Sequence, residues 1–315
     1  MLFLPPHPER KGEGGLRKKG YFKYSYEIEN GRWYACNFRG QRLFEVEPSE
    51  EFEVDLKEFK AKNGVVRLPL ITVITVVLNG KEHLEKTIQS VINQTYPNVE
   101  YIVIDGGSTD GTVDIIKKYD DYIDYWVSEP DRGIYDSWNK GVVLSNGKWL
   151  SFMGSGDLYV NDALSNYILF LGGYSDIENV LYISSKIMLT RNGQQIKIIG
   201  EPWKWKVFAR YMNVGHIGSL HARKLFKFYG MFNEYFKIAG DYELLLRPKE
   251  NLCALFLDKV TVYSDADGIS RRNKRVFKEA LIAKALHTEK GFLLLTYDFI
   301  LAVIKWKIKK LIGIV

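Results

Sequence analysis

Hydrophobic and polar positions follow two alternating patterns from Ile71 onward. The first is a short run of mostly apolar, often β-branched residues, typical of a strand buried on both faces of a sheet; it occurs at 71–77, 99–104, 123–127 and 149–153. The second is an apolar residue at every third or fourth position, which predicts a helix with one buried face; it occurs at 84–92, 113–119 and 134–144. Strands and helices that alternate through short connections predict βαβ units around a parallel sheet, and therefore an α/β fold.

The flanking segments differ from this pattern. Residues 1–20 are rich in Pro, Gly, Lys and Arg and predict a mobile arm. Residues 21–68 predict a small antiparallel β unit and a polar linker with room for a short helix, and Asn30-Gly31 suits a hairpin turn because both positions tolerate a positive φ. The second half is more mixed and predicts a strand at 181–184, a hairpin around Asn192-Gly193, and helices at 226–228, 244–246 and 276–286. The predicted divisions are therefore 1–20, 21–68, a main domain at 69–265 with halves 69–160 and 161–265, and C-terminal helices at 266–315.

Composition narrows the class of protein. A chain of 315 residues with 46% hydrophobic and 26% charged residues is expected to be a soluble globular protein, which excludes a disordered, collagen-like or polytopic membrane chain. The net charge of +6 is too small to predict nucleic-acid binding. Two cysteines form neither a disulfide framework nor a zinc site, and the first residues lack the apolar core of a signal peptide. A cytoplasmic protein is the expectation.

Acidic residues follow successive strands of the predicted sheet. Asp105 ends the second strand, Asp131 and Asp136 follow the third, and Asp157 follows the fourth. Each alone is typical of a helix cap or turn, but a parallel sheet brings these loops to one edge. Carboxylates gathered without basic partners favour a bound cation, and Mg²⁺ or Mn²⁺ bridging to a diphosphate suits oxygen ligands. The glycine-rich loop 106–111 is neither a dinucleotide-binding nor a Walker A motif, and by spacing alone it indicates only a tight turn.

The ordered set of these segments resembles family 2 glycosyltransferases, which have the GT-A fold. The segments that carry the resemblance are Ile74-Thr75-Val76-Val77-Leu78-Asn79-Gly80, Ser90-Val91-Ile92-Asn93-Gln94-Thr95-Tyr96, Val103-Ile104-Asp105-Gly106-Gly107-Ser108-Thr109-Asp110-Gly111-Thr112, Ser128-Glu129-Pro130-Asp131-Arg132-Gly133-Ile134-Tyr135-Asp136 and Asn139-Lys140-Gly141. The resemblance covers roughly residues 70–265. It implies a mostly parallel sheet with flanking helices, to which the N-terminal β unit and the C-terminal helices are additions.

The resemblance also implies roles for individual residues. Val76 and Leu78 would line the pocket for the base of a nucleotide-sugar donor, and Asp105 would accept hydrogen bonds from that base. The rest of the donor pocket would be lined by Asp131, Gly133, Asp136, Lys140, Ser155 and Gly156. The family's D-x-D element reads Gly154-Ser155-Gly156-Asp157, so Asp157 alone would hold Mn²⁺ or Mg²⁺ beside diphosphate oxygens and water.

The second half would supply the catalytic base. The segment Ala239-Gly240-Asp241-Tyr242-Glu243-Leu244 resembles the part of the family that carries it. Asp241 would take the proton of the acceptor hydroxyl, whereas from the residues alone a helix cap is the preferred interpretation. His216 would donate a hydrogen bond to a phosphate oxygen, with a buried structural histidine as the alternative.

These residues together predict an inverting glycosyltransferase. The donor would be a UDP-sugar, and the acceptor a hydroxyl of a glycan or a lipid-linked sugar. The alternatives are a sugar nucleotidyltransferase and a non-catalytic glycan-binding protein on a transferase fold. The apolar and lysine-rich residues 291–315 favour a helix at the inner face of the cytoplasmic membrane, with a packing helix or a contact in a homo-oligomer as alternatives.

Overall fold

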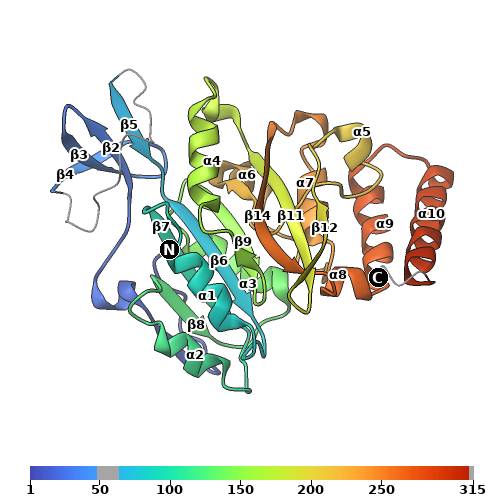
Figure 1. The fold of residues 1–315 in the computed structure, drawn as a ribbon, viewed down its shortest axis with the longest axis horizontal. Coiled ribbons are helices and arrows are strands. Elements are labelled where there is room, and N and C mark those ends of the chain that lie inside the picture. Colours follow the sequence, from blue (N-terminus) through green and yellow to red (C-terminus); the bar gives the residue numbers. More distant parts are fainter. Residues whose placement is uncertain (48–63, 312–315) are drawn as a thin grey trace.

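The computed structural model describes residues 1–47 and 64–311 and contains two β sheets (Figure 1). The large sheet has ten strands in the order β1-β8-β7-β6-β9-β13-β11-β14-β10, with β12 paired to β11. Its strands are β1 (Gly12–Gly14), β6 (Ile71–Val77), β7 (Val99–Asp105), β8 (Tyr125–Ser128), β9 (Trp149–Gly154), β10 (Leu158–Tyr159), β11 (Tyr182–Arg191), β12 (Gln194–Ile199), β13 (Leu220–Ala222) and β14 (Ala254–Asp265). The small sheet has the order β4-β3-β2-β5, from β2 (Ser25–Glu29), β3 (Arg32–Cys36), β4 (Arg42–Val46) and β5 (Val65–Leu68).

Helices lie on both faces of the large sheet. They are α1 (Leu84–Ile92), α2 (Thr112–Lys118), α3 (Ile134–Leu144), α4 (Ala163–Gly172), α5 (Trp205–Phe208), α6 (Arg223–Tyr229), α7 (Gly240–Leu246), α8 (Ile269–Arg272), α9 (Arg275–His287) and α10 (Phe292–Leu311). Strand β6 shows why both faces are covered, because all seven of its residues are buried. Val73 and Val77 join the apolar cluster that holds α1, α2 and α4, whereas Ile74 and Val76 join the cluster that holds α3, α6 and α7.

The central strands confirm the predicted α/β fold. Strands β8, β7, β6 and β9 are neighbours and run parallel, an order produced by βαβ crossovers. The predicted hairpin at Asn192-Gly193 connects β11 and β12, and C-terminal helices are present. Antiparallel β13 and the long β14, which sequence patterning missed, extend the sheet into its second half.

The small antiparallel sheet was also predicted. Asn30 and Gly31 both have positive φ, 50° and 76°, as a two-residue hairpin turn requires. The end of the predicted linker instead forms β5, which pairs with β2. Residues 48–63 of that linker lie outside the described residues. The domain boundaries stay a prediction.

Residues 1–20 differ from the mobile arm that their composition predicts. Strand β1 pairs antiparallel with β8, at the edge of the large sheet. Arg17, which is 2% exposed, lies in a 3₁₀ turn and forms an ion pair of 2.6 Å with the buried Glu100. Glu100 also accepts hydrogen bonds from Thr72 and Asn146, so its charge is fully partnered. This segment is therefore part of the packed structure.

Candidate active site at the strand ends

The carboxyl ends of the parallel strands carry most of the residues predicted to bind the donor. Asp105, the last residue of β7, is fully buried. Its carboxylate accepts hydrogen bonds from the backbone N–H groups of Gly107 and Ser108 and from the hydroxyl groups of Ser108 and Ser128. The contacts show Asp105 shaping the loop that follows its own strand, and its predicted contact with a nucleotide base stays a prediction.

The loops after β6 and β9 touch one another. Val76 is buried at the end of β6, and Leu78, just beyond the strand, is 59% exposed. The hydroxyl group of Ser155 lies 3.4 Å from the carbonyl oxygen of Gly80, and the Gly156 N–H donates to Thr87. The structure therefore places the predicted base-lining residues beside the turn that leads to Asp157.

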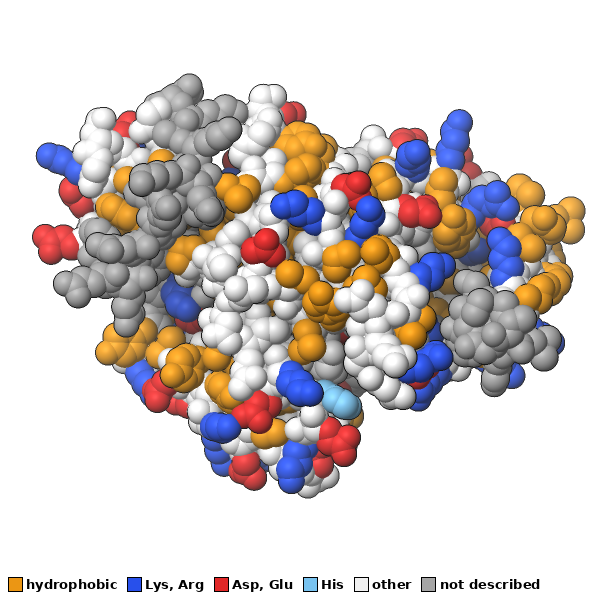
Figure 2. All heavy atoms as spheres, in the orientation of Figure 1, with side chains coloured by type: hydrophobic (Ala, Val, Ile, Leu, Met, Phe, Trp, Pro, Cys, Tyr) orange, Lys and Arg blue, Asp and Glu red, His pale blue; other side chains and the backbone are white. Residues whose placement is uncertain are grey.

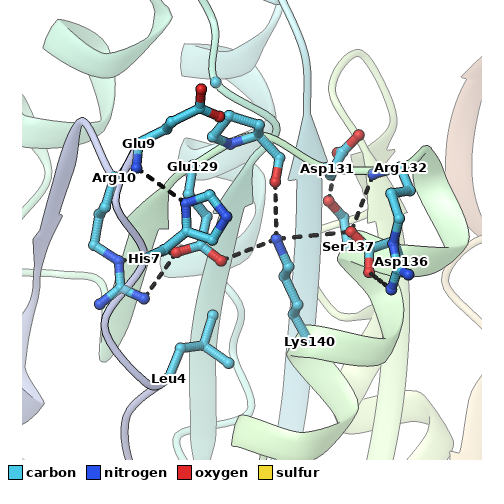
Figure 3. A network of polar contacts seen from close by, with 12 residues as sticks. Leu4, His7, Glu9, Arg10, Glu129, Asp131, Arg132, Asp136, Ser137 and Lys140 are labelled. Carbon is cyan, nitrogen blue, oxygen red and sulfur yellow. Dashed lines mark hydrogen bonds and ion pairs between the residues drawn. The ribbon is translucent and has the colours of Figure 1, made fainter.

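The loop after β8 and the start of α3 form a network of polar contacts (Figure 3). Asp131 accepts hydrogen bonds from the Gly133 N–H and from Ser137. Its carboxylate also lies against the loop after β7 at Gly106, where a Cβ atom would come within 2.5 Å of Oδ2, so a larger residue there would displace the carboxylate. Two neighbouring loops of the predicted donor site are thus held together.

Lys140 lies between two carboxylates of this network. Its ammonium group is 2.9 Å from Glu129 and 3.7 Å from Asp136. Burial by itself would raise the pKa of Glu129, but hydrogen bonds from Lys140 and Arg10 outweigh it and hold that pKa below its usual value. Asp136 likewise has a lowered pKa, because contacts with Arg132 and Lys140 outweigh its burial. Both carboxylates are therefore ionised at neutral pH.

The N-terminal segment joins the same network. Arg10 forms an ion pair of 2.8 Å with Glu129, whose side chain is 4% exposed. Lys11 donates to the backbone oxygens of Gly107 at 2.7 Å and Ser108 at 3.1 Å. Sequence reasoning missed both residues, because composition predicts an arm and the pairing of β1 with β8 cannot be read from it.

Asp157 lies in the turn after β9. Its carboxylate accepts a hydrogen bond from the Gly154 N–H at 3.0 Å, and the Ser264 hydroxyl helps to stabilise its charge. Burial raises its pKa to about 6, and the nearby positive charge of Arg271 on α8 only partly opposes this. A carboxyl group with so high a pKa gains from any cation that approaches it.

Asp241 lies in the first turn of α7, and few groups stabilise its charge. Its Oδ1 accepts a hydrogen bond from the Tyr135 hydroxyl at 3.2 Å and one from the Tyr242 N–H at 2.9 Å. Burial raises the pKa of Asp241 to about 6. The Tyr135 ring fits because residue 240 is glycine, where a Cβ atom would come within 2.8 Å of that ring. Tyr135 belongs to a motif singled out in the sequence, but its contact with Asp241 was not predicted.

His216 is the nearest imidazole to Asp241. Its Nδ1 lies 3.9 Å from Oδ2, too far for a hydrogen bond. Burial lowers the pKa of His216 to about 3, so the ring is neutral and the pair is not an ion pair. The ring packs among Trp138, Phe152 and His221, and neither of its nitrogens has a hydrogen-bond partner among the described residues.

A side chain from the C-terminal helices fixes the segment before Asp241. Glu279 of α9, 3% exposed, accepts hydrogen bonds from the consecutive N–H groups of Lys237, Ile238 and Ala239, at 2.8 to 3.0 Å. Burial would raise the pKa of Glu279, but these N–H groups and Arg275 lower it. Glu279 is thus an ionised anchor of the three residues directly before Gly240 and Asp241, and no sequence signal pointed to it.

The contacts fall into two groups. The donor-side residues predicted from β6, β7, β8 and α3 lie in touching loops, and Asp241 lies near His216. No contact among the described residues joins Asp157 to Asp241, so their convergence on one cleft stays a prediction. A cavity of about 530 Å³ lies elsewhere, between the small sheet and α4, lined by Tyr26, Trp149 and Leu171 among others.

Asp157 fits a divalent cation as a single protein ligand. Among the described residues, no group of three or more His, Cys, Asp or Glu side chains could hold a metal by itself. A partly buried carboxyl group with a raised pKa is a suitable single ligand, and Mg²⁺ keeps several waters and phosphate oxygens in such sites. The residues present therefore fit a cation that a bound diphosphate helps to hold.

A mostly parallel sheet covered by helices, with acidic loops at its strand ends, is the arrangement of a glycosyltransferase of the GT-A type. The sequence pattern of glycosyl transferase family 2 matches residues 72–238, and the chain belongs to that family. Membership of this family is therefore preferred over the two alternatives raised by the sequence, a sugar nucleotidyltransferase and a non-catalytic glycan-binding protein.

Relatives and solved structures agree with this class. A PGL/p-HBAD biosynthesis glycosyltransferase of Mycobacterium bovis (strain BCG / Pasteur 1173P2) is 28% identical over 230 residues, which are 71% of this chain and 87% of that protein. An uncharacterized glycosyltransferase of Mycobacterium tuberculosis (strain H37Rv) is 30% identical over 197 residues, 62% of this chain and 72% of that protein. The structure of S. aureus TarS 1–349 in complex with UDP has a TM-score of 0.53 and 18% identity, and the match covers 73% of this chain and 69% of that fragment. The match spans 42% of the longer TarS chain. TarS supports the fold alone.

Proposed function

We propose that this glycosyltransferase is inverting and uses a UDP-sugar as donor. The acceptor hydroxyl of a glycan or lipid-linked sugar attacks the anomeric carbon from the face opposite the nucleotide. The new bond joins that carbon to the acceptor oxygen, the bond to the diphosphate breaks, and UDP leaves. Asp241 receives the acceptor proton. The observation that carries this proposal is the environment of Asp241, a carboxyl group with two hydrogen-bond donors and a pKa raised to about 6.

The donor-side residues are proposed to hold the nucleotide and its diphosphate. Val76 and Leu78 would contact the base, and Asp105 would shape the loop beside it. The diphosphate end would be lined by Asp131, Gly133, Asp136, Lys140, Ser155, Gly156 and His216. As a neutral imidazole with no hydrogen-bond partner in the part of the chain that the structure describes, His216 is able to donate a hydrogen bond to a phosphate oxygen.

Asp157 would hold Mn²⁺ or Mg²⁺. When bound, such a cation neutralises charge that develops on the departing diphosphate. Arg271 lies close enough to affect the pKa of Asp157, and its guanidinium group would add a second positive charge from the protein.

The test is UDP release from a panel of UDP-sugars in the presence of glycan and lipid-linked acceptors. Asp241→Asn is compared with wild type and with Asp258→Asn, a control that removes an exposed carboxylate paired with Lys186. We expect Asp241→Asn alone to lose transfer, and a full rate in that variant would exclude Asp241 as the base. Omission of Mn²⁺ and Mg²⁺, with a chelator present, tests the metal separately.

A further inference from the structure

Helix α10 presents an apolar stripe to solvent. Leu293, Tyr297, Ile300, Ile304 and Ile308 are 83%, 57%, 50%, 48% and 51% exposed. Their spacing of three and four residues places them in one line along the helix. A surface helix usually turns such a stripe towards the protein core, so this face requires a partner outside the described chain.

The opposite side of α10 already has its partners within the chain. Leu295 is buried, and Asp298 is 9% exposed and lies 2.6 Å from Lys290 and 3.8 Å from Lys284. Trp306 packs edge-on against Phe277 of α9. Helix α10 is therefore docked through a second face, and the exposed stripe is not needed to attach it.

The positive charge of the chain is concentrated in the same region. Residues 266–315 contain eleven Lys and Arg but four Asp and Glu, a net charge of +7, so the preceding 265 residues carry −1. Lys305 and Lys307, both exposed, stand next to Ile304 and Ile308 of the stripe. Figure 2 shows hydrophobic and basic side chains together at the end of the molecule that α10 occupies.

We infer that α10 lies in the interface of an anionic lipid bilayer, with the stripe against the acyl chains and the basic residues on the headgroups. An apolar line with lysines beside it is the pattern of interfacial helices. None of the described helices combines the length and apolar character needed to cross a bilayer. A second copy of the chain fits less well, because a two-fold contact through this face would bring two segments of +7 together. This inference extends the proposed function by favouring a lipid-linked acceptor.

The experiment is sedimentation of the full chain with vesicles of phosphatidylcholine, with or without roughly one-third phosphatidylglycerol. We expect binding to the anionic vesicles that falls as salt rises. The double variant Ile300→Asn/Ile304→Asn should lower the partition coefficient at least about tenfold. Lys305→Gln/Lys307→Gln should lower it about fivefold or more, and only on anionic vesicles.

The matched control is Ile196→Asn/Ile198→Asn, because these isoleucines of β12 are 47% and 46% exposed, close to the values in the stripe. It should bind vesicles as wild type does. Equal binding by wild type and the α10 variants would overturn the inference. So would wild-type dimers in light scattering that the α10 variants convert to monomers. UDP binding without vesicles should be unchanged in every variant, so failure here is distinguishable from failure of the proposed reaction.

A separate observation assigns a role to the N-terminal segment, which lies outside the residues that match the family. We propose that Arg10 and Lys11 are positioning residues of the donor site. Arg10 neutralises part of the charge of Glu129, a carboxylate that would otherwise draw Lys140 away from the donor. Lys11 donates hydrogen bonds to two carbonyl oxygens in the loop after β7 and so holds that loop in place. This proposal rests on the donor site proposed above.

The variants are Arg10→Ala and Lys11→Ala. Lys19→Ala serves as control, because Lys19 lies on the same segment but pairs with Asp120 and Asp121, away from the strand-end loops. We expect KM for the donor and the dissociation constant of UDP to rise roughly fivefold for Arg10→Ala and less for Lys11→Ala, with kcat within about twofold. Arg10→Lys should restore part of the affinity.

An unchanged donor KM in both variants would overturn this role. Equal losses of Tm and activity in all three alanine variants would also do so, because they would indicate a purely structural segment. A wild-type enzyme that transfers no sugar would instead refute the proposed function, which the Asp241 experiment detects independently.

Discussion

Two carboxyl groups of this enzyme, the fully buried Asp105 and the partly buried Asp241, lie in contrasting surroundings. Asp105 ends a central strand, and four donors, three from the loop after it and one from the end of β8, surround its carboxylate. Asp241 begins a helix in the second half, has two donors, and has a pKa raised to about 6. The first arrangement fixes a loop, whereas the second leaves a carboxyl group able to exchange a proton near neutral pH.

The comparison separates structural from chemical residues in a family site. Both aspartates belong to motifs that resemble the family, and the motif alone gives no way to rank them. The number of hydrogen bonds that each carboxylate already accepts does rank them, because a carboxylate with four donors has little capacity left for a ligand. A substitution of Asp241 should therefore lower kcat, whereas a substitution of Asp105 should mainly lower the free energy of unfolding.

Asp241→Asn should give the largest effect, a loss of kcat of about 10² to 10⁴. Its stability should not fall, because the wild-type carboxyl group is ionised in the folded state at neutral pH at a cost of up to ~3 kcal/mol. Steady-state kinetics and urea unfolding at pH 7.5 test both parts. A stable variant with undiminished kcat would place the base elsewhere.

Asp105→Asn should mainly lower stability, by about 3 kcal/mol, because an amide cannot accept from all the donors that now surround the carboxylate. Urea unfolding measures this loss. Asp258→Asn, which replaces an exposed residue of β14, should change the free energy of unfolding by less than about 0.5 kcal/mol. A stable Asp105→Asn enzyme with weakened UDP binding would instead favour a direct contact with the base.

The pH dependence should separate stability from activity. The folded state raises the pKa of Asp241, so its contribution to stability is complete below its unfolded pKa of ~3.9 and is lost as pH rises through about 6. Activity should do the reverse, because only the ionised carboxylate accepts the proton, so kcat/KM should rise with a midpoint near pH 6. A pH series of kinetics and unfolding tests this. Asp157 has a similar pKa, so an acidic limb that survives with residual activity in Asp241→Asn would point to Asp157.

Glu279→Gln should reduce kcat about tenfold, because it weakens the anchor of three N–H groups just before Asp241. The donor KM should change by less than about twofold, since the donor loops lie elsewhere. Glu289→Gln, an exposed residue between α9 and α10, is the control. If KM and Tm alone changed, Glu279 would be a packing residue without influence on the base.

Tyr135→Phe should have the smallest effect. It removes the hydroxyl group that donates to Asp241, so the pKa of Asp241 should rise further and the midpoint of the pH–rate profile should move to higher pH. At pH 8 the rate should stay within about threefold of wild type. A midpoint that does not move would show that this hydrogen bond is too weak to affect the base.

Sequence patterning predicted the region around the donor loops well, because its strands are buried on both faces and its helices have one apolar face. The bounds of β6, α1 and α3 agree with the predicted ranges. Contacts across distant segments could not be predicted in this way. Glu279 lies 38 residues after Asp241 and binds the backbone just before it only because α9 packs on α7. The composition of residues 1–20 likewise gives no sign of the ion pair between Arg17 and Glu100.

The pairing of β1 with β8 determines how a shortened form of the enzyme, without its N-terminal residues, would behave. Residues 72–238, the part that matches the family, would begin after β1 and leave one side of β8 without backbone partners. This fragment would also leave the carboxylate of Glu100 buried without the ion pair that Arg17 supplies. An open strand edge readily recruits strands from other molecules, so this fragment should aggregate where the intact chain stays dispersed.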